Sequence, residues 1–447
     1  MKACIFLSLL TILFFCSNGI LALLRIKHNK VVTCYVASWA VYRNNDGKFG
    51  IPYIRPELCT HIIYAFAGLD STTWTITSLD PNIDIDKDNY KRMTELREQY
   101  PDLKILLAIG GWNEGSKNYS ILASSPTRRA IFVKSVVDFL EEYKFDGFDL
   151  DWEYPGSRGG SPEDKLYFAL LVKQLKEAFN ESNYLLTAAL GSNKGIIDTA
   201  YDIPEISKYL DYIHVMAYDY HGSWDKKVLP NAPLRSGDGL SVMETLNYLL
   251  SKGAPANKTI LGLPMYGRTY ILASKLNSSQ ESPINRTTIT NGFKGPYTDQ
   301  EGFMGYNEIC EELVSHKDNW TSGWDDTSDT PYVINDDHVI VYDNLRSLKA
   351  KIEYAMSLEL AGVMIWSIDT DDFHGKCANL FKDSLNLTDM TYPLLRWINI
   401  VVSENSQVIG DKDSVNIDKE YNDNSSSITK FSHNSILIIL ISLAYYI

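Results

Sequence analysis

The sequence lacks an excess of positive charge, since 42 Lys and Arg residues stand against 56 Asp and Glu residues and give a formal net charge of −14. Phosphate binding needs a basic surface, so this balance argues against a nucleic-acid partner. Long apolar runs are also missing: those at the two ends of the chain fall short of the roughly 20 residues that a membrane-spanning helix needs. The 447 residues, 45% of them hydrophobic, can still form a large core, and a neutral substrate is compatible with the charge.

Cysteine is scarce, with six residues in the chain. Two of the six fall in residues 1–22, where an early Lys2, an apolar run and small residues predict a cleaved signal peptide; an uncleaved membrane anchor is the alternative. The remaining four would mature in an oxidising compartment, and two disulfide bonds are the economical expectation. Three pairings are possible, and the order along the chain favours Cys34 with Cys59 and Cys310 with Cys377. Their spacing is unlike that of a zinc site, so we expect no metal and no cofactor.

Several features predict a secreted protein. Eight Asn-X-Ser/Thr sequons are typical of a secreted glycoprotein. They begin at Asn118, Asn180, Asn257, Asn277, Asn285, Asn319, Asn386 and Asn424. We expect residues 401–434 to form a polar linker and residues 435–447 an apolar tail. Small residues before this tail match a GPI-attachment signal, which predicts membrane attachment at the cell surface; a frayed or interfacial tail is the alternative.

Eight short runs rich in β-branched and aromatic residues alternate with longer segments of helical periodicity. The runs begin at Val31, His61, Lys104, Phe145, Leu185, Asp211, Thr259 and Gly362. Such alternation implies parallel strands with crossover helices, and eight repeats predict an α/β fold of the (β/α)₈ TIM-barrel type over residues 28–400. An open doubly wound sheet is the alternative, and only the count of runs separates the two.

One gap between the seventh and eighth runs is longer than a crossover needs. Residues 269–338 are rich in Thr, Asn, Gly and Asp and mix turn signals with a short helix. We therefore predict a small α+β insertion domain between strands 7 and 8.

The run FDGFDLDWEYPG, residues 145–156, places four carboxylates in a buried strand. Successive side chains of a strand alternate between its faces, so Asp149, Asp151 and Glu153 share one face. In a barrel this face is the interior, and Glu153 reaches the C-terminal mouth, where barrel active sites lie. Asp146 has the opposite parity, which predicts a structural role.

Three carboxylates stacked at low dielectric cannot all ionise cheaply, so some must share protons, and the last should have a raised pKa. A carboxyl group that stays protonated can act as a general acid. A calcium site is the alternative, but calcium ligands usually come from loops rather than from an alternating strand.

The segment DGFDLDWE resembles the DxxDxDxE signature of glycoside hydrolase family 18, which contains chitinases and lectin-like relatives. Further segments resemble this family in the same order over residues 31 to 400: CYVASWAVYR, YAFAGLD, LLAIGGWNEGS, MAYDYHGSWD, LPMYGRTY and GVMIWSIDTDDF. Several motifs in one order make a chance match very improbable. The resemblance implies a (β/α)₈ barrel and endo-hydrolysis of chitin or chitooligosaccharides by a secreted protein, which we expect to be a monomer.

The resemblance also implies substrate-assisted retention, an exception to the usual pair of carboxylates. Glu153 would protonate the leaving oxygen, Asp151 would orient the acetamido group of the sugar, and Asp149 would share a proton with Asp151. Tyr218 and Asp219 would grip the acetamido group.

The residues expected to bind substrate are mostly aromatic, and indoles can present flat apolar faces to sugar rings. Trp366 is expected as the floor of the cleavage subsite, and the other candidates are Trp39, Trp112, Trp224, Met216, Tyr266, Arg268, Tyr35 and Phe66. A lone Trp is more often part of the core than of a ligand site. For Tyr35 and Phe66, the barrel interior and the pocket lining are equally good interpretations.

Two rival functions remain. A chitin-binding lectin or growth-factor-like relative would have lost a motif carboxylate, whereas all of them are present here. An endo-β-N-acetylglucosaminidase acting on N-glycans shares the carboxylate motif, but the insertion and the aromatic series favour a long chitin-like substrate.

Overall fold

The computed structural model describes residues 28–276, 281–289, 291–381, 384–385 and 389–406. The predicted signal peptide, the apolar tail and most of the predicted linker lie outside these residues. Helix α11 (Pro393–Asn405) continues past residue 401, with Val401 and Val402 buried, so the predicted start of the linker is too early. No helix in the described part of the chain is long and apolar enough to cross a bilayer.

Eight parallel strands form a closed barrel, which confirms the predicted fold. They are β1 (Val31–Ala37), β2 (His61–Asp70), β4 (Lys104–Gly110), β5 (Gly147–Asp151), β6 (Leu185–Gly191), β7 (Tyr212–Met216), β8 (Thr259–Pro264) and β14 (Gly362–Trp366). Their order is β1-β14-β8-β7-β6-β5-β4-β2, and pairing of β1 with β2 closes the ring. Strand β3 (Thr75–Ser78), which pairs antiparallel with the end of β2, was not predicted.

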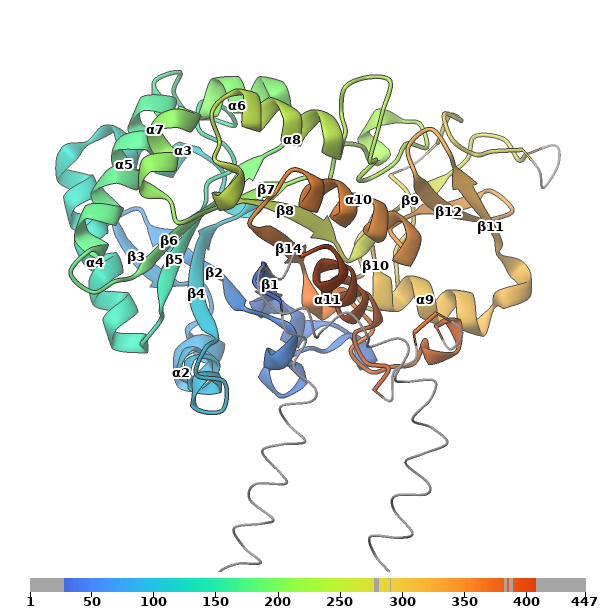
Figure 1. The fold of residues 1–447 in the computed structure, drawn as a ribbon, viewed down its shortest axis with the longest axis horizontal. Coiled ribbons are helices and arrows are strands. Elements are labelled where there is room, and N and C mark those ends of the chain that lie inside the picture. The colour runs from blue at the N-terminus through green and yellow to red at the C-terminus, as the bar shows by residue number, and fades with distance from the viewer. Residues whose placement is uncertain (1–27, 277–280, 290, 382–383, 386–388, 407–447) are drawn as a thin grey trace, which may run out of the picture. The chain divides into compact units, whose positions relative to one another are not determined.

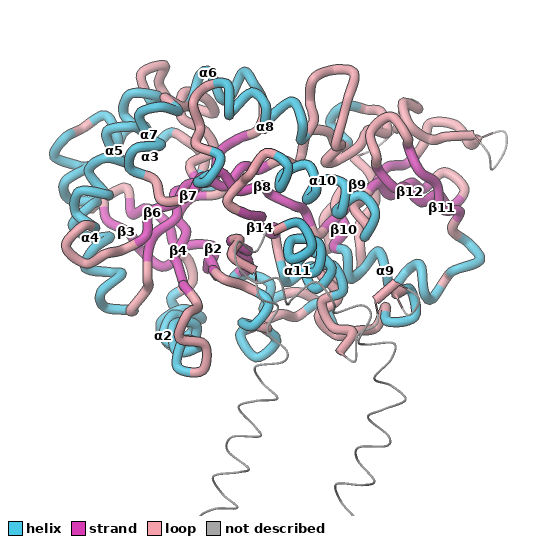
Figure 2. Tube along the Cα trace, in the orientation of Figure 1, coloured by secondary structure: helices cyan, strands magenta, loops and turns pink. Residues whose placement is uncertain are grey.

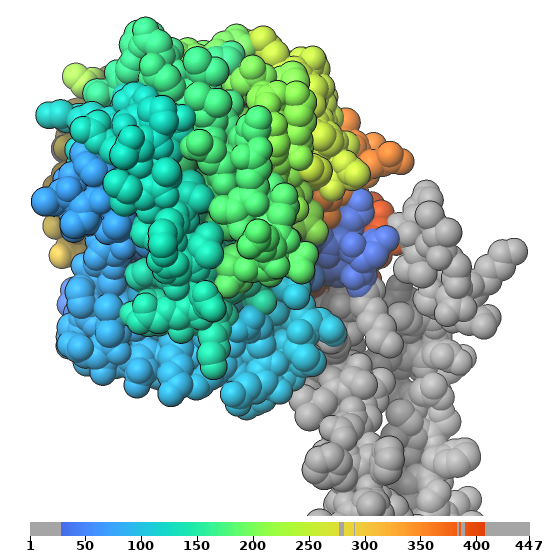
Figure 3. All heavy atoms as spheres, turned by 90° about the vertical axis from the view of Figure 1, so that its left-hand side faces the viewer, coloured from blue at the N-terminus to red at the C-terminus, as the bar shows by residue number. Residues whose placement is uncertain are grey.

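Helices cover the barrel, and Figures 1 and 2 show them around the strands. They are α2 (Asn89–Thr94), α3 (Lys117–Ser124), α4 (Pro126–Tyr143), α5 (Asp164–Phe179), α6 (Lys194–Ala200), α7 (Ile203–Tyr209), α8 (Val242–Ser251), α10 (Leu345–Ser357) and α11. Helix α4 begins where Ser125 accepts a hydrogen bond from the backbone N–H of Arg128, and Pro126 suits its first turn. Figure 3 views the side on which α4 and α5 lie.

Strand side chains divide between two buried clusters. In β4, Ile105, Leu107 and Ile109 pack with the helices, whereas Leu106 and Ala108 belong to the cluster inside the barrel. Burial on both faces is typical of parallel strands between helices. The barrel interior is therefore packed, and polar groups inside it are removed from water.

The insertion is a second, antiparallel sheet with one helix, as the α+β prediction required. Its elements are β9 (Tyr266–Ile271), β10 (Met304–Gly305), α9 (Tyr306–Ser315), β11 (Thr321–Asp325), β12 (Thr330–Asn335) and β13 (His338–Val341), with the strands in the order β10-β9-β13-β12-β11. Strands β9 and β13 pair from Arg268 to Ile271, so the sheet extends slightly beyond residues 269–338. Figure 1 shows β11, β12 and α9 on the side opposite α4 and α5.

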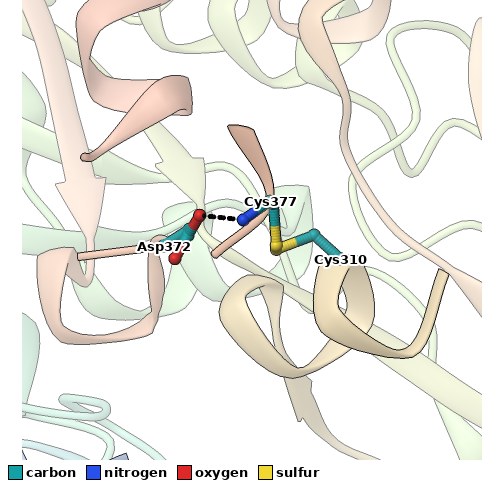
Figure 4. A group of neighbouring side chains, drawn as sticks. All are labelled: Cys310, Asp372 and Cys377. Carbon is teal, nitrogen blue, oxygen red and sulfur yellow. Dashed lines mark hydrogen bonds between the residues drawn. A yellow bond between two sulfur atoms is a disulfide. The ribbon is translucent and has the colours of Figure 1, made fainter. Parts of the chain in front are cut away.

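Two disulfide bonds join the predicted partners, Cys34 with Cys59 and Cys310 with Cys377. The second ties α9 of the insertion to the segment that follows β14. In Figure 4 the carboxylate of Asp372 lies beside this bond and accepts a hydrogen bond from the backbone N–H of Cys377, at 2.7 Å.

Candidate active site

Strand β5 places apolar and acidic side chains on opposite faces, in line with their parity. Phe148, Leu150 and Trp152 belong to the cluster under the helices, and the rings of Trp152 and Phe168 on α5 lie 6.0 Å apart. Asp149 and Asp151 are buried. Glu153 lies two residues beyond the last residue of the strand, Asp151, and is partly exposed. The three carboxylates therefore run from the barrel interior towards its C-terminal end.

Asp149 has hydrogen-bond partners on three of the other barrel strands. Tyr35 on β1 donates to Oδ2 at 2.7 Å, and the Thr187 hydroxyl on β6 donates to Oδ1. His214 Nδ1 on β7 lies 3.3 Å from Oδ1, and the other ring nitrogen lies 3.3 Å from the Thr33 hydroxyl. Because three strands contribute, the position of this carboxyl is fixed by the barrel itself.

The carboxyl group of Asp151 has fewer hydrogen-bond partners than that of Asp149. Its Oδ1 is buried and receives no hydrogen bond from the described residues. Burial raises the pKa of Asp151 well above its ordinary value, and the nearby carboxylates of Glu153 and Asp149 raise it further. Gly110 allows this close packing of β4 on β5, since a Cβ there would lie 2.1 Å from the Asp151 carbonyl oxygen. A proton is thus retained near the end of the acidic face.

Burial raises the pKa of Glu153 to about 7, against the lowering effects of a hydrogen bond from Tyr154 and the charge of Arg158. Ser116 contacts the residues on both sides of Glu153: its hydroxyl accepts from the indole Nε1 of Trp152 at 2.6 Å and donates to the backbone carbonyl of Tyr154 at 2.8 Å. A carboxyl that is protonated near neutral pH and held in place has the properties of a general acid.

Asp219, just beyond β7, accepts hydrogen bonds from Tyr266 at 2.7 Å and from Arg268, and its side chain is 44% exposed. Tyr218, whose hydroxyl lies 3.9 Å from Met364 Sδ, is buried, and burial raises its pKa well above the usual value. Tyr266 and Arg268, which hold Asp219, both lie on β9, so the insertion supplies part of this site. Met216 is buried beside Tyr218 inside the barrel.

The predicted aromatic residues form two groups. Trp366 contacts Tyr35, Phe66 and Trp39 at ring-centroid distances of 5.4, 5.9 and 6.2 Å, so these four rings form one cluster. Its outer member, Trp39, is 45% exposed, whereas Tyr35 and Phe66 are buried.

The second group consists of separate indoles. Trp224 is 55% exposed and lies 4.9 Å from the Arg268 guanidinium. Trp112 is 59% exposed and contacts Arg158 instead. Large exposed indoles among polar groups suit the binding of sugar rings.

Asp146 lies apart from this face. Its Oδ1 pairs with Arg97 at 2.6 Å and its Oδ2 accepts from the backbone N–H of Ile105 at 2.8 Å. These bonds join the starts of β4 and β5, at the end of the barrel away from Glu153.

Several residues of the site were not predicted. His214 shares its parity with Met216 on β7, so the alternation of that strand could have identified it. Tyr154 and Arg158 directly follow the acidic run. Thr187 and Phe303 had no such signal, since Thr187 lies in an otherwise apolar strand and Phe303 reaches the site only because it stacks on Tyr266 at 4.5 Å.

The acidic face has no arrangement of free ligands for a metal. Among the described residues, one group of three potential ligands lies close enough together, Cys310, Asp372 and Cys377 (Figure 4). Its two sulfur atoms are bonded to each other, and thiolates are the form that binds metal. This group is therefore structural.

Comparisons with known proteins agree with this geometry. The model of the family "Glycosyl hydrolases family 18" matches residues 31–371. "Probable chitinase 2" of Drosophila melanogaster is 48% identical over 395 residues, which cover 83% of this chain and 80% of that protein.

Solved structures give the same result. The Group IV chitinase of Ostrinia furnacalis is 40% identical, with a TM-score of 0.78, covering 84% of this chain and 100% of that one; it has also been solved with allosamidin. Human YKL-39, described as a pseudo-chitinase that retains chitooligosaccharide binding, is 30% identical, with a TM-score of 0.74 over 83% of this chain and 99% of that chain. The chain belongs to glycosyl hydrolases family 18.

Proposed function

We propose that this protein is a secreted, endo-acting chitinase, which hydrolyses β-1,4 linkages between N-acetylglucosamine units by substrate-assisted retention. Its membership of family 18 and its similarity to chitinases over most of their length support glycoside hydrolase activity on chitin. The observation that carries the proposed mechanism is the acidic face that begins on β5. There Glu153, with a pKa of about 7, lies beyond a buried Asp151 whose Oδ1 receives no hydrogen bond from the described residues.

Glu153 acts as the acid in the first step. Its proton passes to the glycosidic oxygen as the bond from that oxygen to the anomeric carbon breaks, and the shortened chain leaves as an alcohol. The 2-acetamido oxygen of the retained sugar attacks the anomeric carbon and forms an oxazolinium ion. Water then opens this ring and gives its proton to the Glu153 carboxylate, so the configuration is retained and no enzyme nucleophile is used.

Asp151 orients the acetamido N–H and balances the positive charge of the oxazolinium ion. Its retained proton is shared with Asp149, whose two oxygens also accept from Tyr35 and Thr187. The hydroxyl of Tyr218 and the carboxylate of Asp219 hold the acetamido group and the neighbouring sugar. Such fixed groups stabilise charge that develops in the transition state.

A binding protein without activity is the main rival. YKL-39 shows that this fold can bind chitooligosaccharides as a pseudo-chitinase. The retained Glu153 and Asp151, with their raised pKa values, favour an enzyme here. An endo-β-N-acetylglucosaminidase is a weaker rival, because the exposed indoles Trp39, Trp112 and Trp224 suit a long linear chain.

We further propose secretion, action as a monomer, and attachment through a GPI anchor. The predicted signal peptide and the apolar tail support secretion and the anchor. Release of the protein from cells by a phosphatidylinositol-specific phospholipase tests the anchor, and retention on the cells after treatment would contradict it.

The activity is tested with N-acetylglucosamine oligomers and long soluble chitin chains, using the unaltered protein and Glu153→Gln. We expect shorter oligomers with retained β configuration from the unaltered protein, and an early fall in chain length on the polymer, as endo cleavage requires. Absence of hydrolysis, or equal rates for the two proteins, would refute the proposal.

A further inference from the structure

The loop that follows Glu153 carries an exposed cation, Arg158, which makes three contacts. Its guanidinium carbon lies 3.5 Å from the centroid of the Trp112 ring. Its Nη2 donates to the Trp112 carbonyl at 2.8 Å and its Nη1 to the Glu153 carbonyl at 2.9 Å. One side chain therefore connects an exposed indole to the backbone of the proposed general acid.

Arg158 is held in place by a well-bonded loop. The buried carboxylate of Asp164 accepts from the backbone N–H groups of Gly156 and Ser161 at 3.1 and 2.8 Å, and from the Ser120 hydroxyl at 2.6 Å. Arg158 itself has a φ of 50°, a left-handed conformation that is costly for a residue other than glycine. These bonds fix the loop that presents the guanidinium, although its side chain is exposed.

The turn that carries Trp112 is fixed separately. Glu114 accepts from the backbone N–H of Leu69 at 3.1 Å and from the Tyr119 hydroxyl at 2.9 Å. With Arg158 over one face of the ring, Trp112 still has 59% of its surface exposed. The planar guanidinium can stack on the indole and donate two hydrogen bonds at once, which a lysine cannot do.

We propose that Arg158 is a positioning and specificity-determining residue, which fixes Trp112 beside Glu153 and, by its charge, favours a neutral N-acetylated sugar over a cationic glucosamine at Trp112. This inference rests on the proposed function, since it assumes that Trp112 binds a sugar of the chain. The two sugars differ there by an acetyl group and, where the amine of glucosamine is protonated, by one positive charge. Two like charges about 7 Å apart in water change an affinity roughly threefold, and partial removal of water increases this to about tenfold or more.

Two variants separate the charge from the geometry. Arg158→Gln removes the charge, whereas Arg158→Lys keeps the charge and loses the stacked plane with its two donors. Arg346→Gln is the matched control, because Arg346 is also exposed and its guanidinium carbon lies 3.7 Å from the Trp324 ring centroid, in contacts outside the site.

The test is calorimetric binding of the N-acetylglucosamine tetramer and the glucosamine tetramer, with each variant built on Glu153→Gln so that no substrate is consumed. We expect Arg158→Gln to lower the preference for the N-acetylated tetramer about threefold to tenfold. Arg158→Lys should keep the preference but bind the N-acetylated tetramer several-fold more weakly, and Arg346→Gln should change neither quantity. An unchanged preference in Arg158→Gln would overturn the specificity role, and unchanged affinity in Arg158→Lys the positioning role.

A second readout uses the active protein. The charge of Arg158 lowers the pKa of Glu153, so Arg158→Gln should move the alkaline fall of kcat/KM to higher pH, and Arg346→Gln should not. If the pH dependence of kcat/KM is the same in Arg158→Gln as in the unaltered protein, Arg158 does not act on Glu153 through its charge. If the unaltered protein hydrolyses no oligomer, the proposed function fails, while the binding preference still decides the inference about Arg158.

Discussion

The two ends of strand β5 carry the same kind of side chain in opposite surroundings. At the start, Asp146 has an ion pair with Arg97 and a backbone donor. At the far end, Asp151 has a buried oxygen to which no residue in the described part of the chain donates, and Glu153 has a pKa of about 7. A carboxylate that has an ion pair and hydrogen-bond donors stabilises the fold. A buried carboxyl group without such partners keeps its proton and can give it to a substrate.

A raised pKa is not sufficient by itself. Burial also raises the pKa of Asp371 to about 7, but its carboxylate accepts from backbone N–H groups at the start of α11, including that of Leu395 at 2.9 Å. Glu153 differs because it is partly exposed at a strand end among aromatic side chains. Position and access to substrate separate the catalytic group from the structural one.

The largest expected effect is on activity when Glu153 is changed to Gln. Without a proton donor, kcat on N-acetylglucosamine oligomers should fall by about 10³-fold or more. Asp146→Asn is the control at the other end of the strand and should stay within about threefold of the unaltered protein. Comparable losses of kcat in both variants would contradict the assignment of a catalytic role to Glu153 and a structural role to Asp146.

Asp151→Asn should lower kcat by about 10²-fold, because the oxazolinium ion loses its balancing charge. The asparagine can still fill the space of the carboxyl group, so we expect the thermal midpoint to change little or to rise. Initial rates on the oligomers, measured together with the midpoint, check this. Near-normal rates would show that Asp151 is only structural.

Stability should depend on pH through Glu153. Its pKa is raised in the folded protein, so the folded state binds more protons than the unfolded state between pH 4.5 and about 7, and stability falls as pH rises through this range. Glu153→Gln has no such group and should therefore be more stable than the unaltered protein at pH 8, by on the order of 2–3 kcal/mol. Denaturant unfolding at pH 4 and pH 8 measures this, and an equal difference at both would be inconsistent with a raised pKa.

Asp146→Asn should have a smaller effect, on stability alone. Loss of the ion pair with Arg97, which lies in the segment before β4, weakens the link between that segment and the start of β5 and should cost about 1–2 kcal/mol. Denaturant unfolding measures this cost. A large loss of activity without loss of stability would place Asp146 in the catalytic group instead.

The spacing of apolar runs along the chain and the alternation of side chains along β5 predicted much of the fold and of the acidic face. Alternation along β5 separated Asp149, Asp151 and Glu153 from Asp146 before any geometry was known, and eight recurrent apolar runs predicted the barrel. Contacts between distant segments were beyond such reasoning, because they depend on the register of neighbouring strands and on how loops return to the barrel. Thr187 beside Asp149 and Phe303 on Tyr266 are examples, and so is the stacking of Arg158 on Trp112.

The central claim is that an uncompensated carboxyl at the C-terminal end of β5 is the general acid. The most direct test is the pH dependence of kcat/KM for the N-acetylglucosamine tetramer, because this quantity reports groups of the free enzyme. We predict that kcat/KM falls as pH rises through about 7, where Glu153 loses its proton. A value that stays constant or increases from pH 6 to pH 9 would contradict the account.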